Sequence, residues 1–346
     1  MTGRLWCRLG ALVIAALTVG AAVVAAQDGQ RQDGQRQNIF RYVLDVEPPE
    51  PTGFVPLDLG TRRVYRATGP KPVAAAVLAS AATGDSVSLA ANLEFSPYYL
   101  LGGGTRTLES YRANSVAGRL RRIVTKTLIG VAVAHDPSLP GATRLGLALR
   151  ATFHDPHDVT SAYYGLAERV DSALAAHDTD PASEADDVTD LGVDLSPIFA
   201  DARRAARARC CVQVSGGYGF AALAQGGRLA GDSIGPLRHT VWVSAQWTLS
   251  PRLDLLVLLQ GTNAFRSDWH QRLGVAFERK ASRVDLLGEL YFDSEFQRLY
   301  PGLTVEAAVA HGLAIDAGIL AEAGGVDASP RLRSALMLRW MLAHAR

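Results

Sequence analysis

The sequence predicts an all-β fold: a transmembrane antiparallel β-barrel of about 12 strands with a small helical insertion, formed by residues 72–346. From residue 86 onward, apolar and polar residues alternate in many segments, which is typical of strands with one apolar face. These segments are about ten residues long, the length that crosses a bilayer at a tilt. Their polar faces carry both charge signs together with glycine and alanine, as a barrel lumen does. A soluble β-sandwich would also alternate, but its strands usually have about five or six residues.

The amino terminus indicates secretion. Arg4 and Arg8 precede an apolar run over residues 11–26, which is typical of a cleavable signal peptide, and we expect cleavage before Gln27. An uncleaved anchor is the alternative, although the run is shorter than the ~20 residues that span a bilayer. Residues 27–71 begin with a duplicated polar motif and continue with several prolines. They are predicted to be a disordered, Pro-rich periplasmic tether.

Strands are expected in eleven segments of the remaining chain. An even-stranded barrel needs one more, which we place either at residues 73–82 or at residues 105–113. The eleven segments are residues 86–96, 119–134, 143–154, 210–225, 239–249, 252–261, 269–280, 283–293, 303–310, 312–321 and 331–342.

The connections between these segments predict an orientation. If the carboxyl end is periplasmic, the tight turns near Pro251, Ser282 and Gly312 are periplasmic, and most longer connections are extracellular. The largest insertion, residues 155–209, then falls on the periplasmic side. It combines a helical stretch, an acidic run and a basic helix, and it could plug the barrel, dock a periplasmic protein partner or simply be a solvated surface segment.

Charge excludes some functions and suggests another. Lys and Arg number 35 against 34 Asp and Glu, for a net charge of +1, so nucleic acid is not an expected partner. No cofactor is expected. Opposite charges on inward faces predict ion-pair networks that would close a narrow pore. The arginines are Arg144, Arg150, Arg272, Arg283, Arg331, Arg333 and Arg339; the acids are Asp254, Glu278, Asp285, Glu289, Glu306 and Asp316.

Two clusters could carry chemistry. His154, Asp155, His157 and Asp158 have side chains that bind metals, although the segment also suits a strand end followed by a helix N-cap at Asp158 or Thr160. We therefore predict no metal site there.

The second cluster is Asp268, His270 and Asp293, which would face inward near the outer mouth, where such groups could activate water. A charged lumen network explains the same residues, and neither a Gly-x-Ser-x-Gly elbow nor a phospholipase-type His-x-Ser-Asn-Gly stretch occurs. No catalytic site is predicted, and the protein is expected not to be an enzyme.

The signal peptide, the ten-residue strands and a last strand that ends Leu338-Arg339-Trp340-Met341-Leu342 together resemble bacterial outer-membrane β-barrel proteins in general. The resemblance implies an outer-membrane location, with membrane lipid and the barrel-assembly machinery as partners. An aromatic residue near the carboxyl end serves that machinery in this class. The expected function is a narrow channel or a structural component whose periplasmic insertion docks or plugs. The alternative is an outer-membrane hydrolase with a site at the extracellular mouth.

Overall fold

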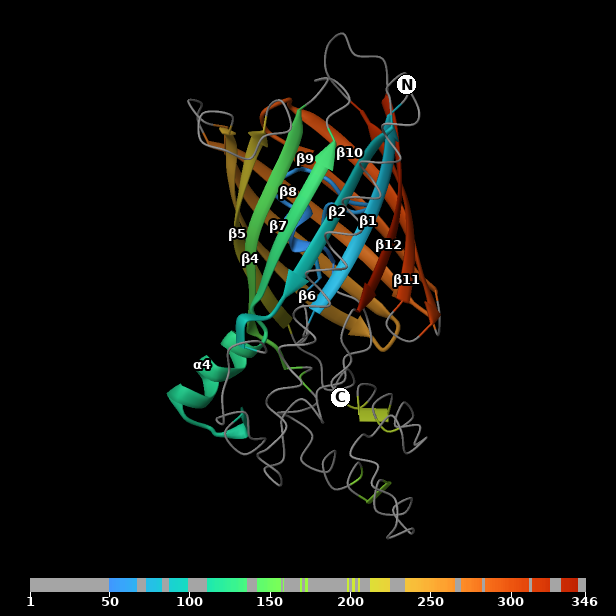
Figure 1. Cartoon of the computed structure of the whole chain (residues 1–346). Coiled ribbons are helices and arrows are strands. Elements are labelled where there is room, and N and C mark those ends of the chain that lie inside the picture. The colour runs from blue at the N-terminus through green and yellow to red at the C-terminus, as the bar shows by residue number, and fades with distance from the viewer. Residues whose placement is uncertain are drawn as a thin grey trace, which may run out of the picture.

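The computed structural model describes residues 50–66, 73–82, 87–98, 111–135, 142–156, 212–224, 234–264, 269–281, 284–310, 313–323 and 331–341, and a few single positions between 158 and 205. Within these residues twelve antiparallel strands form one closed barrel (Figure 1). Each strand pairs with its neighbours in the chain, so the barrel has an up-and-down topology. The strands are β1 (Val73–Ala82), β2 (Ser88–Phe95), β3 (Leu128–His135), β4 (Thr143–His154), β5 (Val212–Ala224), β6 (Ile234–Ser250), β7 (Leu253–Ala264), β8 (Trp269–Lys280), β9 (Val284–Asp293), β10 (Arg298–Ala310), β11 (Leu313–Glu322) and β12 (Arg331–Met341).

The twelfth strand is β1, which closes the barrel. It pairs with β2 on one side and with β12 on the other, with Val77 opposite both Ala91 and Leu338. Of the two candidate segments, residues 73–82 therefore supply the missing strand. Residues 105–110 lie outside the described residues, and Tyr111 and Arg112 are helical.

One predicted strand is partly wrong. The first part of residues 119–134 forms a helix, α4 (Val116–Thr125), and the strand β3 begins only at Leu128. Ser115 caps the helix, since its side chain accepts a hydrogen bond from the backbone nitrogen of Gly118 at 3.0 Å. Val116, Leu120 and Val124 repeat every four residues, which is a helical period rather than a strand period.

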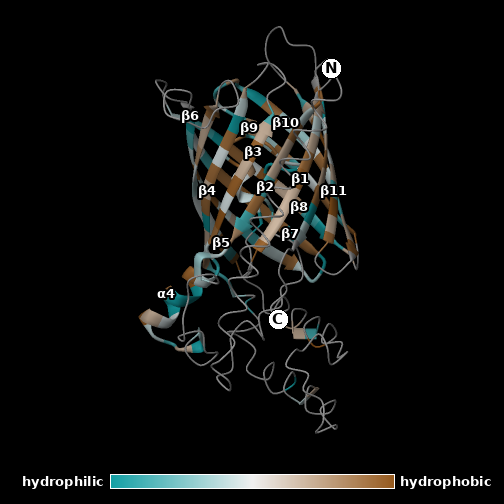
Figure 2. Cartoon of the chain, in the orientation of Figure 1, coloured by the Kyte–Doolittle hydropathy of each residue, from teal (hydrophilic) through white to brown (hydrophobic). Residues whose placement is uncertain are grey.

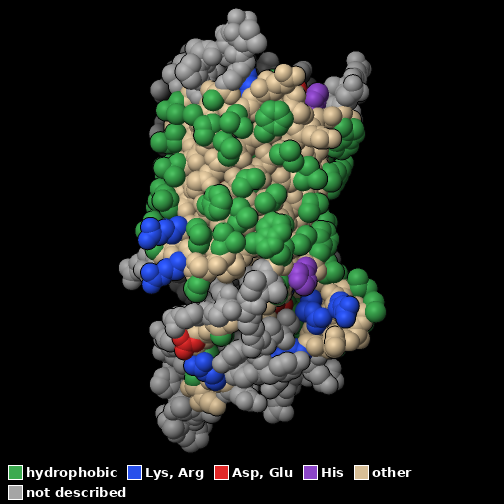
Figure 3. Space-filling model, turned by 180° about the vertical axis from the view of Figure 1, so that it is seen from behind, with side chains coloured by type: hydrophobic (Ala, Val, Ile, Leu, Met, Phe, Trp, Pro, Cys, Tyr) green, Lys and Arg blue, Asp and Glu red, His purple; other side chains and the backbone are tan. Residues whose placement is uncertain are grey.

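The outer surface of the barrel is apolar and its interior is polar. Along β8, the outward side chains of Leu273 and Phe277 are 50% and 52% exposed, whereas the inward Glu278 is 0% exposed. Figure 2 shows apolar residues along the strands, and the view from behind in Figure 3 shows apolar side chains covering the barrel between its ends. A closed barrel pairs the backbone groups of its strands with one another. Because its outer face is also apolar, the barrel can lie in lipid. None of the described helices is long and apolar enough to cross a membrane.

The two ends of the barrel differ in their connections. We call the end where β12 finishes the lower end and the opposite end the upper end, as in Figure 1. Short turns join β6 to β7, β8 to β9 and β10 to β11 at the lower end. The two longest connections, residues 96–127 and 155–211, are at the lower end as well, as the turn count predicts for the insertion. Strands β7 and β10 extend further than expected, so four residues remain in each of the upper connections 265–268 and 294–297.

Residues 50–66 lie inside the barrel, where their ribbon is visible between the strands in Figure 1. We call this segment the plug. The sequence analysis placed these residues in a disordered tether outside the barrel, and here the structure differs. The segment carries Phe54, Val55 and Leu57, which are buried, and charged groups that pair with the barrel wall. These contacts compensate the entropy of ordering a Pro-rich chain.

Candidate functional site in the barrel lumen

The plug is a loop whose two ends meet. The carboxylate of Glu50 accepts hydrogen bonds from the backbone nitrogen and Nε of Arg66, at 3.0 and 3.1 Å. Between them the chain makes a short 3-10 helix, η2 (Thr52–Phe54), and then turns back through Asp58 and Gly60, whose φ angles are 59° and 135°. Such angles suit glycine, and aspartate is among the few other residues that adopt the left-handed region readily. Residues 58–60 form a partly exposed tip, whereas residues 50–57 and 61–66 are buried.

Inward-facing glycines of the wall make room for the plug backbone. A methyl group built on Gly146 would lie 2.4 Å from the carbonyl oxygen of Gly53, and one on Gly318 would lie 2.3 Å from that of Thr61. Such distances are far inside van der Waals contact, so only glycine fits. Around the barrel, five wall glycines each face a plug atom, which would lie 2.3–3.1 Å from a methyl group built on the glycine. They are Gly130 in β3, Gly146 in β4, Gly219 in β5, Gly274 in β8 and Gly318 in β11.

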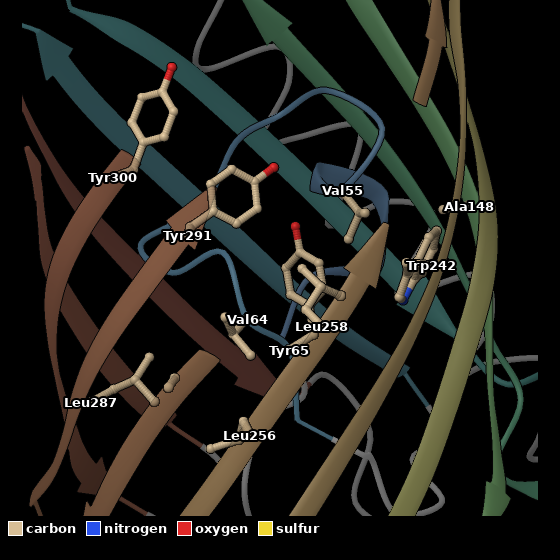
Figure 4. Close-up of a cluster of buried hydrophobic side chains, with 11 residues drawn as sticks. Val55, Val64, Tyr65, Ala148, Trp242, Leu256, Leu258, Leu287, Tyr291 and Tyr300 are labelled. Atoms are coloured by element: carbon tan, nitrogen blue, oxygen red, sulfur yellow. The ribbon is translucent and has the colours of Figure 1, made fainter. Parts of the chain in front are cut away.

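Aromatic side chains pack the plug against one side of the wall (Figure 4). Val55, Val64 and Tyr65 of the plug join a buried cluster with Trp242 and Tyr291 of the wall. The rings of Tyr65 and Trp242 meet edge to face with 6.4 Å between centroids. Trp242 and Tyr291 both alternate with outward residues and face the lumen, at 1% and 4% exposure.

Two plug arginines lie among carboxylates near the lower end. Arg62 contacts Glu306 at 2.5 Å and Glu278 at 3.5 Å, and Arg66 contacts the same two carboxylates at 2.5 and 3.0 Å. Glu50 lies 3.0 Å from Arg62 and completes the group. We call these five residues the lower ion-pair cluster. All are at least nine-tenths buried, so each charge depends on its partners to offset its loss of water.

Wall side chains also bind the plug backbone directly. The carboxylate of Glu289 accepts hydrogen bonds from the backbone nitrogens of Arg63 and Val64, at 2.8 and 3.1 Å. Arg150 donates to the carbonyl oxygen of Glu50 at 2.9 Å, and Glu94 accepts from the backbone nitrogen of Thr52 at 3.2 Å. These bonds satisfy buried backbone groups that have no strand partner, so the wall specifies the path of the loop.

A second charged group surrounds the plug tip. The Oδ1 atom of Asp58 accepts hydrogen bonds from Arg63 at 2.6 Å and from Arg272 at 3.1 Å. Arg238 of β6 and Arg333 of β12 lie near the upper ends of their strands, in phase with the buried, inward-facing residues of those strands. We call Arg63, Arg238, Arg272 and Arg333 the upper arginine cluster. Its three wall arginines belong to β6, β8 and β12, so they come from separate parts of the barrel.

The weak catalytic candidates are only partly described. Asp293 is 2% exposed and lies 2.8 Å from Nε of Arg272, which neutralises its charge. His270 is half-buried and lies on the same face of β8 as Arg272, two residues before it. Asp268 lies outside the described residues. The lumen network therefore accounts for Asp293.

Two of the weak metal candidates, Asp155 and Asp158, have protein partners. Lys126 Nζ lies 2.9 Å from Asp155 and 2.6 Å from Asp158, and Asp158 also accepts a 2.5 Å hydrogen bond from the hydroxyl of Tyr111. Burial opposes the charge of Lys126, but the two carboxylates outweigh it and raise the pKa of the ammonium group. His154 is exposed, and His157 lies outside the described residues. Among the residues that the structure describes, no group of three side chains could hold a metal ion. This cluster pins the start of the insertion after β4.

The barrel defines the class of this protein. Its ladder is closed, its outer face is apolar, and its charged side chains point into the lumen. The chain has the fold of outer-membrane β-barrel proteins. No family model matches it, and no curated protein matches it in sequence.

Solved structures of similar fold include the KdgM porin in complex with disordered oligogalacturonate, with 4% identity, 77% of this chain and 98% of that chain covered, and a TM-score of 0.43. The NanC porin has 7% identity, the same coverage and a TM-score of 0.40. The outer membrane protein Omp33 of Acinetobacter baumannii has 8% identity, with 78% and 98% of the two chains covered and a TM-score of 0.35.

The plug escaped sequence reasoning, although two signals for it are present. Phe54, Val55 and Leu57 are out of place in a disordered tether, and arginines at 62, 63 and 66 follow closely. Glycines also recur on the polar faces of predicted strands, where a second chain segment could approach. Neither signal identifies the partner, because the contacts join residues 42 to 244 positions apart.

Proposed function

We propose that this protein is an outer-membrane channel that is closed by its own amino-terminal segment, residues 50–66. The observation that carries the proposal is the fit between plug and wall, in which five wall glycines each face a plug atom. A lumen filled only for stability could use larger wall side chains. Here the wall gives up side-chain volume so that a separate, removable piece of chain can fill the space.

The plug is placed so that it could leave without threading through the barrel. Its two ends meet at the Glu50–Arg66 contact, and Arg62 and Arg66 contact Glu278 and Glu306, which lie near the lower ends of β8 and β10. The tip at Asp58 lies toward the upper end. In the proposed orientation the lower end is periplasmic, so the loop enters from the periplasm as a hairpin-like insert. A periplasmic event could therefore withdraw the plug. In this proposal the plug, and not the insertion at 155–209, closes the barrel.

Glycine substitutions test the proposal without removing any chain. Gly146→Val and Gly318→Val place side chains where the plug backbone lies, and valine suits a strand. Gly288→Val is the matched control, since Gly288 faces outward and a methyl group built there meets nothing within 4 Å. Refolded proteins are compared in planar bilayers. We expect the wild type and Gly288→Val to stay closed. Gly146→Val and Gly318→Val, which we call the seat variants because these glycines contact the plug, should conduct.

A deletion and a peptide provide the second arm. The variant that lacks residues 50–66 should conduct, and a synthetic peptide of residues 50–66 added to the lower-end side should block it. The same peptide with Arg62→Gln and Arg66→Gln should block poorly, because it cannot neutralise Glu278 and Glu306. Folded seat and deletion variants that all remain closed would contradict the proposal, and a wild type that conducts as freely as they do would contradict it too.

A further inference from the structure

The upper arginine cluster holds more positive charge than the plug tip requires. Asp58 has one carboxylate, which accepts hydrogen bonds from Arg63 and Arg272, while Arg238 and Arg333 add two more cations near the same end of the lumen. Among the described residues, Arg272 has a second acidic partner in Asp293, whereas neither Arg238 nor Arg333 is within ion-pair distance of any acid. Positive charge that is concentrated around a single acid is a setting for anion binding.

We propose that the upper arginine cluster is a binding site for carboxylate-bearing solutes, and that Asp58 is its internal occupant in the closed state. Guanidinium groups match carboxylates in shape and hydrogen-bonding pattern, and several of them can share one anion. The Asp58 carboxylate already shows the arrangement, with hydrogen bonds from two arginines on Oδ1. A solute carboxylate would take over the wall arginines, and Arg63 would remain with Asp58 on the plug.

The site can be reached from the upper end. Residues 58–60 are the partly exposed portion of the plug, and the side chain of Asp58 is 28% exposed. Arg333 is exposed, whereas the lower ion-pair cluster is buried. A solute that enters from the upper mouth therefore meets the upper arginine cluster before the lower ion-pair cluster.

The exchange gives the site a role in opening. Asp58 holds the plug tip to the wall through Arg272, so a solute that replaces Asp58 removes one of the plug's attachments. This role rests on the proposed channel function. Binding itself does not, because the site lies on the outer side of the closed plug.

Calorimetric titration of the full-length folded protein in detergent at low salt tests the site. The probe is tricarballylate, with glycerol as an uncharged compound of the same carbon backbone. Asp58→Asn keeps a side chain that tolerates the left-handed backbone but removes the competing charge. We expect it to bind tricarballylate at least about tenfold more tightly than the wild type does. Arg238→Gln/Arg333→Gln in the Asp58→Asn background should abolish that gain.

Arg252→Gln, at an exposed lower-end turn, is the matched control and should bind as the wild type does. Folding of every variant is checked by electrophoresis in denaturing detergent, where an unheated folded barrel and a boiled, unfolded one migrate differently. Equal affinity of Asp58→Asn and wild type would overturn the proposal, as would undiminished binding without Arg238 and Arg333. If tricarballylate binds but the plug-deleted variant never conducts, the site stands and the channel fails. If that variant conducts but tricarballylate does not bind, the channel stands and the site fails.

Discussion

Arg339 offers a quantitative test of how the lumen is held together. Its guanidinium lies 2.8 and 2.9 Å from the two carboxylate oxygens of Asp316, and both side chains are 0% exposed. It also lies 2.7 Å from Glu306. In Arg339→Met, Glu306 keeps the plug arginines Arg62 and Arg66, but Asp316 loses its cationic partner. Removing one member of a buried pair costs about 3–5 kcal/mol, because the remaining charge stays buried and uncompensated.

The double variant Arg339→Met/Asp316→Asn separates this cost from lost packing. It removes both charges, so we expect it to recover most of the stability that the single variant loses. The assay is reversible urea unfolding in phospholipid vesicles, followed by tryptophan fluorescence. Arg279→Met is the control: this arginine is exposed near the same end of the barrel, and its loss should leave the midpoint unchanged. Equal destabilisation in the single and double variants would refute the reasoning.

Three further predictions concern the outer face and the lower end. Val275→Arg, which puts a charge on the lipid-facing side of β8, should cost about 2–4 kcal/mol in the same unfolding assay if that position lies near the bilayer midplane. Lys126→Met should leave Asp155 and Asp158 without their cation, so protease should cleave the 155–209 insertion faster than in the wild type. Burial, together with the Asp158 carboxylate, raises the pKa of Tyr111 well above its usual value. A raised pKa stabilises the fold below the unfolded value of about 10 and ceases to do so as pH rises through the folded value. Tyrosinate absorbance should therefore be the same for wild type and Tyr111→Phe through the range near pH 10 in which ordinary tyrosines ionise, and a difference in that range would contradict the assignment.

The barrel could be predicted from local patterns. A strand that faces lipid on one side and a lumen on the other must alternate with a period of two, and β8 shows this from Leu273 to Glu278. The antiparallel up-and-down topology then follows from short connections. Closure required one more strand, and residues 73–82 met that requirement because the strand count had to be even.

Other features could not be predicted because they depend on contacts distant in sequence. Trp242 faces inward by its place in the alternation, but its contact with Tyr65 of the plug joins distant parts of the chain. In α4 the leucine and valines that alternate weakly as a strand also repeat as a helix, and the Ser115 cap decides between the two. The plug has no period of its own, since the wall determines its path through Glu94, Arg150 and Glu289.

The sequence predicted ion pairs between opposite charges of the wall, but it did not predict that the plug supplies many of the partners. Wall arginines were expected to neutralise wall acids, and Arg339 does so with Asp316. Glu278 and Glu306, however, take much of their positive charge from the plug. At the other end the relation reverses, because the wall arginine Arg272 takes negative charge from Asp58 of the plug. Each charged layer of the wall is thus completed by the opposite charge on the plug. Withdrawing the plug would expose an acidic layer near the lower end and a basic layer near the upper end. The wall charges that attract the closed plug would then act on a solute that passes through the lumen.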